Sequence, residues 1–127
     1  DCGGRILLAE DNVINQQVTA TILRKAGYTV DIAADGAEAV SMWQQNTYGL
    51  ILMDWHMPVM DGLEATRRIR QLEQAPARIP VIALTANAMQ GHEQQVHAAG
   101  MDGYLTKPFQ ARQLLAAIDS FLSGGDS

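Results

Sequence analysis

The sequence predicts an α/β fold in which five parallel strands form a doubly wound sheet. Short apolar segments alternate with helical patterns along the 127 residues of the chain. Each helical segment is long enough for the crossover connection that parallel strands require. Three of the strand segments are continuous apolar runs, which is typical of strands that helices cover on both faces.

The predicted elements follow one another as five pairs of a strand and a helix. Runs of apolar and β-branched residues predict strands at 6–9, 28–33, 50–53, 81–84 and 103–106. Helical patterns predict helices at 13–26, 37–45, 63–72, 92–99 and 111–122. Gly27 and Gly100 stand just past two of these helices, where a residue with a left-handed backbone commonly ends a helix.

Length and composition indicate a single globular domain. With 127 residues, of which 47% are hydrophobic and 18% charged, the chain can bury a core and lies near the globular average. We expect residues 1–4 to be a linker, residues 5–122 to form the folded domain and residues 123–127 to be a tail. Because the chain starts with Asp1 rather than Met and ends in a Gly- and Ser-rich segment, we expect it to belong to a longer protein.

Charge and cysteine content exclude several classes of protein. The net charge is −5 and Lys and Arg form no clustered run, so we expect no direct contact with nucleic acid. The single cysteine, Cys2, cannot form an internal disulfide. The apolar runs are too short to span a bilayer and the N-terminus lacks a signal-peptide pattern. We therefore expect a cytoplasmic, monomeric domain.

Charged and polar residues follow four of the predicted strands. Glu10 and Asp11 follow the first strand, Asp54 the third, Thr85 the fourth and Lys107 the fifth. Ligands of doubly wound sheets bind outside the carboxyl ends of the strands. An acid pair after a strand is also typical of a turn or a helix N-cap, so the prediction of a site here depends on the combination.

These residue types suit a magnesium ion and phosphoryl transfer. Three carboxylates brought together repel one another unless a cation joins them, and Mg²⁺ prefers one or two carboxylates, waters and phosphate oxygens. We expect Asp11 and Asp54 to bind it directly and Glu10 through water. Asp54 would attack the donor phosphorus, while Lys107 balances charge on the oxygens. The Thr85 hydroxyl and the Ala86 backbone N–H would hold the phosphoryl group.

Several segments together resemble the receiver domains of two-component signalling systems. They are 9–12 (AEDN), 52–58 (LMDWHMP) with 60–62 (MDG), 84–86 (LTA) and 105–109 (LTKPF). The resemblance covers nearly the whole chain and implies the flavodoxin-like (βα)5 receiver fold. It implies a domain that catalyses its own phosphorylation on Asp54, from a phosphohistidine, and its own dephosphorylation. It also implies Mg²⁺ ligands from Glu10, Asp11, Asp54 and the main-chain carbonyl of His56.

The same resemblance implies a conformational switch and a kind of parent protein. Thr85 and Tyr104 match the switch pair, in which the hydroxyl moves toward the phosphate and the ring turns inward. Further segments, 10–12 (EDN) with Asn15, 83–89 (ALTANAM) and 99–104 (AGMDGY), are similar to receivers of hybrid sensor histidine kinases. This implies a kinase parent that can be anchored in the inner membrane. A stand-alone response regulator is the alternative.

We expect the partner to be a histidine phosphotransfer domain or a histidine kinase domain. On the first helix, Ile14 and Val18 fall outside the apolar stripe, which is formed by Asn15, Thr19, Ile22, Leu23 and Ala26. Together with Pro108 and Phe109, which follow the fifth strand, they are predicted to form a docking surface beside the acids. Scattered exposed apolar residues are also common on surfaces that bind nothing.

Two other functions compete with this interpretation. A phosphatase of the haloacid dehalogenase type also uses an aspartyl phosphate on a parallel sheet. Its motif requires a second acid two residues after the nucleophile, where this chain has His56, and that acid protonates the leaving group. A receiver-like scaffold that never carries phosphate is the second alternative, because a fold does not by itself imply a function.

Overall fold

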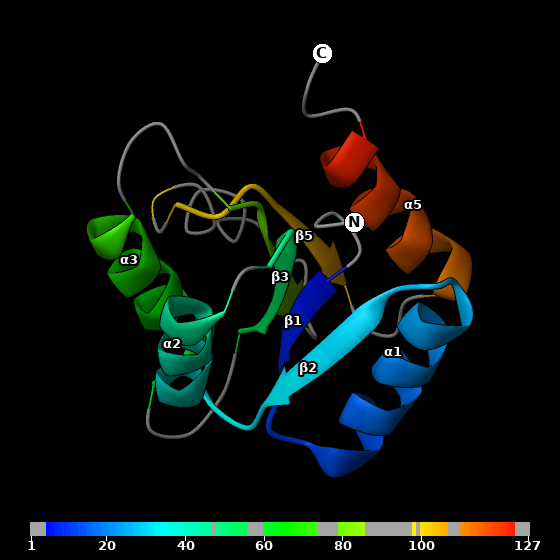
Figure 1. The fold of residues 1–127 in the computed structure, drawn as a ribbon, viewed down its shortest axis with the longest axis horizontal. Coiled ribbons are helices and arrows are strands. Elements are labelled where there is room, and N and C mark those ends of the chain that lie inside the picture. The colour runs from blue at the N-terminus through cyan, green and yellow to red at the C-terminus, as the bar shows by residue number, and fades with distance from the viewer. Residues whose placement is uncertain are drawn as a thin grey trace.

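The computed structural model describes residues 5–46, 48–55, 60–73, 79–85, 98, 100–106 and 110–123 (Figure 1). Within these ranges there are five strands: β1 (Arg5–Ala9), β2 (Thr29–Ala33), β3 (Leu50–Asp54), β4 (Val81–Thr85) and β5 (Gly103–Thr106). The helices are α1 (Val13–Lys25), α2 (Gly36–Gln45), α3 (Gly62–Leu72) and α5 (Ala111–Ser123). All strands are parallel, in the order β2-β1-β3-β4-β5. The predicted doubly wound fold is confirmed.

The boundaries of the elements differ slightly from those predicted. β3 and β4 each run one residue further, so that Asp54 and Thr85 are the last residues of their strands. α2 and α3 each begin one residue earlier, at a glycine that follows an aspartate N-cap. Of the predicted helix at 92–99, only Ala98 lies within the described residues, and it is helical.

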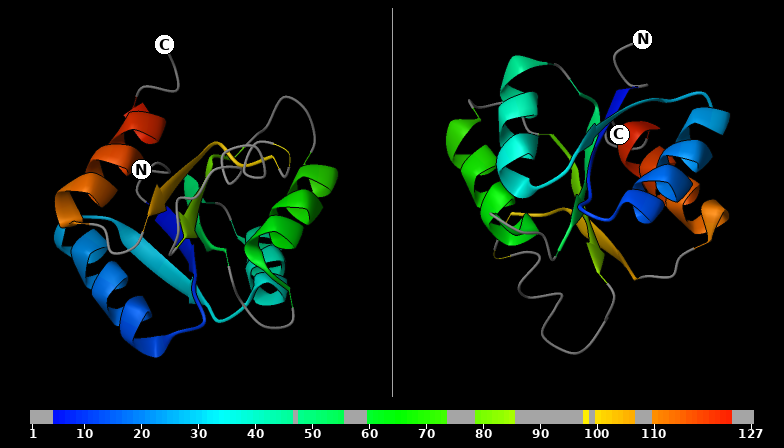
Figure 2. Two further views of the ribbon diagram at one scale, coloured as in Figure 1. Left: turned by 180° about the vertical axis from the view of Figure 1, so that it is seen from behind. Right: turned by 90° about the horizontal axis from the view of Figure 1, so that it is seen from below.

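The sheet separates two layers of helices and two apolar cores. Helices α1 and α5 lie on one face, and α2 and α3 lie on the other (Figure 2). Because side chains alternate between the faces of a strand, Leu7, Ile51 and Val81 pack on the side of α2 and α3. Their neighbours Leu8, Leu52 and Ile82 pack on the side of α1 and α5. Strands β3 and β4 are buried along their whole length, as the continuous apolar runs predicted.

The core face of α1 differs from the predicted stripe. Thr19, Ala20 and Leu23 are the buried residues of this helix, whereas the predicted Asn15 and Ile22 are only half-buried and Ala26 is exposed. The prediction is therefore confirmed for Thr19 and Leu23, and Ile22 packs against the same cluster. It was wrong for Ala26 and it missed Ala20, whose small side chain lets the helix approach the sheet and lies in the same cluster as Leu8 and Leu23.

Gly27 and Gly100 have the predicted left-handed backbone, with φ of 101° and 94°. The amide of Gly27 donates to the carbonyl oxygen of Arg24 at 3.0 Å and so closes α1. None of the described helices is both long enough and apolar enough to cross a membrane.

Candidate active site

The register of the sheet brings those predicted site residues that the structure describes to one edge. Ala9 of β1 pairs with Met53 of β3, so Glu10, the next residue after Ala9, follows the strand at the level of Asp54. Thr85 of β4 lies one position beyond Leu84, which pairs with Asp54. The carboxyl ends of β1, β3 and β4 therefore meet, as expected for a parallel doubly wound sheet.

Three carboxylates gather at this edge. Glu10, Asp11 and Asp54 each offer a carboxylate oxygen, and these oxygens all lie within 4.8 Å of one another. Glu10 is 1% exposed and Asp54 is 6% exposed, whereas Asp11 faces solvent. Like charges this close repel strongly where protein replaces water, so the arrangement favours a cation between them.

The donor set fits a magnesium ion. Carboxylate oxygens are the hard ligands that Mg²⁺ prefers, and oxygens on opposite sides of the ion lie about 4 Å apart. The carboxylate oxygens of the three acids lie no more than 4.8 Å from one another, which is compatible with one ion between them. Glu10, Asp11 and Asp54 would hold it, and the fourth predicted ligand, the carbonyl of His56, lies outside the described residues.

The turn after β1 is held by hydrogen bonds on several sides. The Glu10 amide donates to the carbonyl oxygen of Ala33 at 3.0 Å, which extends the pairing of β1 with β2. The Glu10 carbonyl accepts from Nε2 of Gln16 at 2.5 Å, and its Oε2 accepts from the amide of Asn12 at 3.3 Å. Asn12 is also the N-cap of α1, because its side chain accepts from the amide of Asn15 at 3.1 Å. The acidic turn and the start of α1 therefore form one hydrogen-bonded unit.

Asp54 is positioned by the strand pairing and by a close approach of α3. The amide of Trp55 donates to the carbonyl of Leu84 at 2.9 Å, and the amide of Gly62 donates to the carbonyl of Trp55 at 3.1 Å. A Cβ on Gly62 would collide with the carbonyl oxygen of Asp54, so only glycine fits here. Asp61 caps α3 by accepting from the amide of Glu64 at 2.9 Å. These contacts give a physical reason for the Asp61–Gly62 pair that the sequence alone did not supply.

The predicted switch residues lie on neighbouring strands and on one face. Tyr104 pairs with Ala83, and Thr85 is two residues beyond Ala83, so both side chains project from the face that carries α2 and α3. Thr85 is buried and Tyr104 is partly exposed at the edge strand. Ala86 and Lys107, predicted to bind phosphate, lie outside the described residues.

The predicted docking residues of α1 are exposed. Ile14 is 70% exposed and Val18 is 55% exposed, and Val13, which was not among the predicted docking residues, is exposed as well. All three belong to the helix whose N-cap is hydrogen-bonded to Glu10. Pro108 and Phe109, the other residues of the predicted docking surface, lie outside the described residues.

Two solved structures with the same fold contain a bound metal ion or a bound protein. The chain is similar to the receiver domain of the sensor histidine kinase PA1611 from Pseudomonas aeruginosa PAO1, with 46% identity and a TM-score of 0.86 over 94% of this chain and 98% of that one. That structure has a magnesium ion coordinated in its active-site cleft. The Saccharomyces cerevisiae co-crystal structure of the phosphotransfer protein Ypd1 and the Ssk1 receiver domain also matches, with 33% identity, a TM-score of 0.86 and coverage of 92% and 87%.

Curated sequences and a family description agree with these structures. Hybrid signal transduction histidine kinase I of Dictyostelium discoideum is 39% identical over 122 residues, which are 91% of this chain and 7% of that protein. This chain thus spans a small part of that relative. Residues 6–119 match the family described as the response regulator receiver domain. The match covers most of the chain, which therefore belongs to the response regulator receiver domain family.

Proposed function

We propose that this receiver domain accepts a phosphoryl group from a phosphohistidine onto Asp54 in a magnesium-dependent reaction. The observation that supports this most directly is the carboxylate cluster. Asp54 is nearly buried at the end of β3, and oxygens of Glu10 and Asp11 lie within 4.8 Å of its own. A carboxylate held in this way is oriented toward the edge of the sheet where ligands of such folds bind.

In the proposed reaction, a carboxylate oxygen of Asp54 forms a bond to phosphorus while the bond from phosphorus to the histidine nitrogen breaks. The electron pair of that bond returns to the imidazole nitrogen, and the phosphoryl group moves to Asp54. A bound magnesium ion would supply charge neutralisation on the phosphoryl oxygens. Lys107 would neutralise them further, and the Thr85 hydroxyl and the Ala86 amide would hold them. The fourth ligand of the metal would be the carbonyl of His56.

Thr85 and Tyr104 are proposed to transmit the phosphorylation state. A phosphoryl group on Asp54 would draw the Thr85 hydroxyl toward it, and the Tyr104 ring would turn inward over the same face of the sheet. The common face of the two residues and the partial exposure of Tyr104 support this. The Tyr104 ring lies at the surface of the edge strand and would turn toward the Thr85 hydroxyl on the same face. Such a pair is a two-state element that phosphate can bias.

We further propose that the partner is a histidine phosphotransfer domain that docks on α1, and that the parent is a cytoplasm-facing hybrid histidine kinase. Ile14 and Val18 are exposed beside the acidic turn, and Pro108 and Phe109 would extend the surface. The similarity to the receiver of a Ypd1 complex and to hybrid kinases supports the kind of partner and the kind of parent.

The phosphoacceptor is tested with a small acyl phosphate and magnesium, followed by intact-mass measurement. We expect the wild-type domain to gain one phosphoryl group, and the gain to be lost in Asp54→Asn and without the metal. Asp119→Asn, which removes an exposed carboxylate on α5, is the matched control and should be phosphorylated normally. Equal phosphorylation of Asp54→Asn would show that the nucleophile is another residue, and no phosphorylation of the wild type would favour the scaffold alternative.

Docking is tested by comparing a phosphohistidine protein donor with the small donor. Ile14→Ala and Val18→Ala should slow transfer from the protein by about tenfold each, since each removes apolar area worth about 1.4 kcal/mol or more from an interface. Leu72→Ala, at an exposed apolar position of α3, controls for loss of surface area elsewhere. Equal slowing with both donors would mean that these side chains support the fold rather than the docking surface.

A further inference from the structure

We propose that Gln16 is a positioning residue of the magnesium site, because it fixes the peptide that joins Glu10 to Asp11. The inference rests on the proposed metal site and adds to it a residue that is not itself a ligand. Gln16 lies on α1, near its start, and its side chain is half-buried. Its Nε2 donates to the Glu10 carbonyl oxygen at 2.5 Å.

Gln16 is well anchored to hold that oxygen. Its amide donates to the Asn12 carbonyl at 2.9 Å, which is the first hydrogen bond of α1. The side chain therefore reaches back from a formed helix turn onto the acidic turn that precedes it. The Glu10 amide and carboxylate are restrained by Ala33 and by Asn12, at 3.0 Å and 3.3 Å. Gln16 restrains the third polar group of Glu10, its carbonyl.

The direction of the Glu10 carbonyl determines where the carboxylate of Asp11 lies. The Glu10 C=O and the Asp11 N–H belong to one planar peptide, so rotation of that plane swings the backbone of Asp11 and everything attached to it. Glu10 is packed at the end of a strand, whereas Asp11 is exposed in a bend. The packing that holds Glu10 therefore does not extend to Asp11. Instead, the hydrogen bond from Gln16 restrains the peptide that precedes Asp11.

Magnesium is the ion for which such a restraint matters most. Mg²⁺ demands near-ideal octahedral geometry, whereas Ca²⁺ accepts variable geometry and a variable number of oxygens. Residues that orient the ligands of a metal site commonly change its affinity by about 10–100-fold. Loss of the restraint should therefore weaken magnesium binding more than calcium binding. A residue that only stabilised α1 would affect both ions equally.

The test uses Gln16→Leu, which removes the donor and keeps the charge and the helix propensity. Gln16→Asn keeps the amide but is one methylene too short to reach the turn. Gln17→Leu, at the adjacent exposed position of α1, is the matched control. Binding of Mg²⁺ and of Ca²⁺ is followed by the fluorescence of Trp55, which adjoins Asp54 and is buried, in a Trp43→Phe background.

We expect the magnesium affinity to fall by about tenfold in both Gln16 variants and to stay unchanged in Gln17→Leu. The ratio of magnesium to calcium affinity should fall as well. In the metal-free protein, amide exchange at Asp11 should be faster in Gln16→Leu than in Gln17→Leu. Magnesium affinity within twofold of the wild type, or an equal loss of both ions, would overturn the role of Gln16. A wild type that shows no saturable response to magnesium would instead overturn the metal site itself.

Discussion

Two regions of the sheet arrange their carboxylates in opposite ways. At the carboxyl ends of the strands, three acids gather with their oxygens within 4.8 Å of one another. Near the starts of β4 and β5, Glu73 and Asp102 both lie 2.9 Å from Arg70. Asp31, in the middle of β2, lies 2.7 Å from Arg5 at the start of β1. Carboxylates therefore lie close together at the carboxyl ends of the strands, where we propose the chemistry. Away from that edge, carboxylates are paired with arginines.

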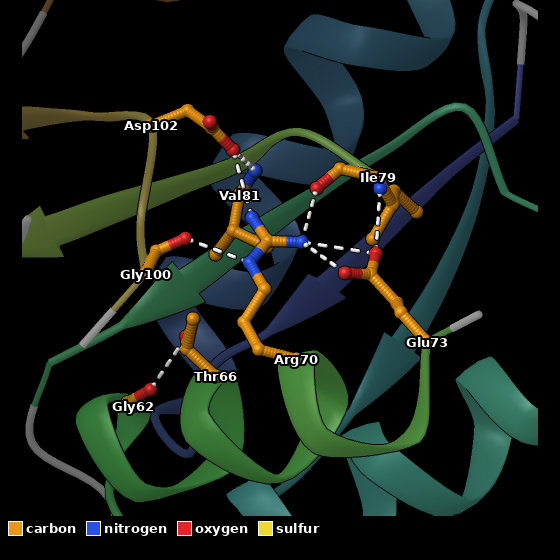
Figure 3. A network of polar contacts seen from close by, with 8 residues as sticks. All are labelled: Gly62, Thr66, Arg70, Glu73, Ile79, Val81, Gly100 and Asp102. Atoms are coloured by element: carbon orange, nitrogen blue, oxygen red, sulfur yellow. Dashed lines mark hydrogen bonds and ion pairs between the residues drawn. The ribbon is translucent and has the colours of Figure 1, made fainter. Parts of the chain in front are cut away.

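The larger of these paired networks is centred on Arg70 at the end of α3 (Figure 3). Its guanidinium, a rigid fork with five N–H donors, donates to the carbonyls of Gly100 and Ile79 and to the carboxylates of Glu73 and Asp102, at 2.8 to 2.9 Å. Asp102 also accepts from the amide of Val81 at 2.9 Å. The network therefore joins the end of α3 to the starts of β4 and β5.

The smaller network joins β1, β2 and the loop before β3. Arg5 donates to Asp31 at 2.7 Å, Tyr48 donates to the same oxygen at 2.8 Å, and the guanidinium lies 5.1 Å from the centre of the Tyr48 ring. The hydrogen bonds from Arg5 hold the pKa of Asp31 below its usual value. Burial, helped by the hydrogen bond to Asp31, raises the pKa of Tyr48 to about 12.

The contrast suggests that the ion pairs stabilise the fold and that the three gathered acids serve a ligand. The paired charges hold their part of the sheet in one arrangement without any ligand. The gathered acids at the carboxyl ends should instead lower the stability of the metal-free domain through their mutual repulsion, which would be a common cost of a functional site. A change of charge in either group should therefore affect stability in a different way.

Removing Arg70 should have the largest effect on stability. Arg70→Met keeps much of the apolar volume but leaves the carboxylates of Glu73 and Asp102 without their guanidinium, at side-chain exposures of only 9% and 21%. Breaking a buried charge pair by removal of one partner costs about 3 kcal/mol or more. Urea unfolding of the variant should show a loss of that size in the free energy of unfolding.

Arg67→Met is the control for Arg70→Met. Arg67 is on the same helix but is 53% exposed and lies 3.9 Å from Glu64, so its loss should change the free energy of unfolding by less than about 0.5 kcal/mol. If the two variants were equally stable, the Arg70 network would not hold the starts of β4 and β5 together.

Neutralising Asp11 should raise the free energy of unfolding, whereas removing Arg70 should lower it. Asp11→Asn removes one of the three gathered charges, and a pair of like charges at such a separation costs about 1 kcal/mol near water. The metal-free variant should therefore be more stable than the wild type by about that amount. Magnesium should raise the melting temperature of the wild type and leave that of the variant nearly unchanged, because binding to the folded state stabilises it.

Asp119→Asn serves as the reference for the Asp11 experiment, because it removes an exposed acid of α5. Surface interactions of an exposed acid contribute little, so the variant should change the metal-free stability by less than about 0.5 kcal/mol and leave the response to magnesium unchanged. A metal-free Asp11→Asn variant less stable than the wild type would mean that Asp11 makes a structural contribution greater than its repulsion.

Lowering the pH should weaken the network of Arg5, Asp31 and Tyr48. The resulting change in the free energy of unfolding should be the smallest of the three. The folded-state pKa of Asp31 is lowered, so its contribution is present above its unfolded-state pKa, about 3.9, and is lost as the pH falls through the folded-state value. The difference in unfolding free energy between the wild type and Asp31→Asn should be constant from about pH 5 to 7 and narrow below about pH 4. The effect is small because the side chains of Arg5 and Asp31 are 40% and 28% exposed and water screens them. A difference that did not narrow would indicate that Asp31 stabilises the fold by packing rather than by its charge.

Much of the fold and part of the site followed from local patterns. The alternation of apolar runs with helical stretches predicted the doubly wound sheet. Gly27 marked the end of α1 correctly, and Gly100 has the predicted left-handed backbone. The acids after β1 and β3 were predicted to meet because parallel strands place their carboxyl ends at one edge, and Glu10, Asp11 and Asp54 do meet. The exposure of Ile14 and Val18 was also predicted correctly, whereas their role in docking stays a prediction.

The sequence by itself determined which residues carry the carboxylates and hydroxyls of the candidate site and which strand each of them ends or follows. It could do so because periodicity and turn residues are local properties of the chain. Only the tertiary structure decided which residues act together across long separations. Arg70 contacts Asp102, which is 32 residues away, and Gln16 turns back onto Glu10. The choice of Ala20 for the core of α1 was decided in the same way. These contacts depend on the order and twist of the strands and on how closely each helix approaches the sheet, and no local pattern specifies those quantities.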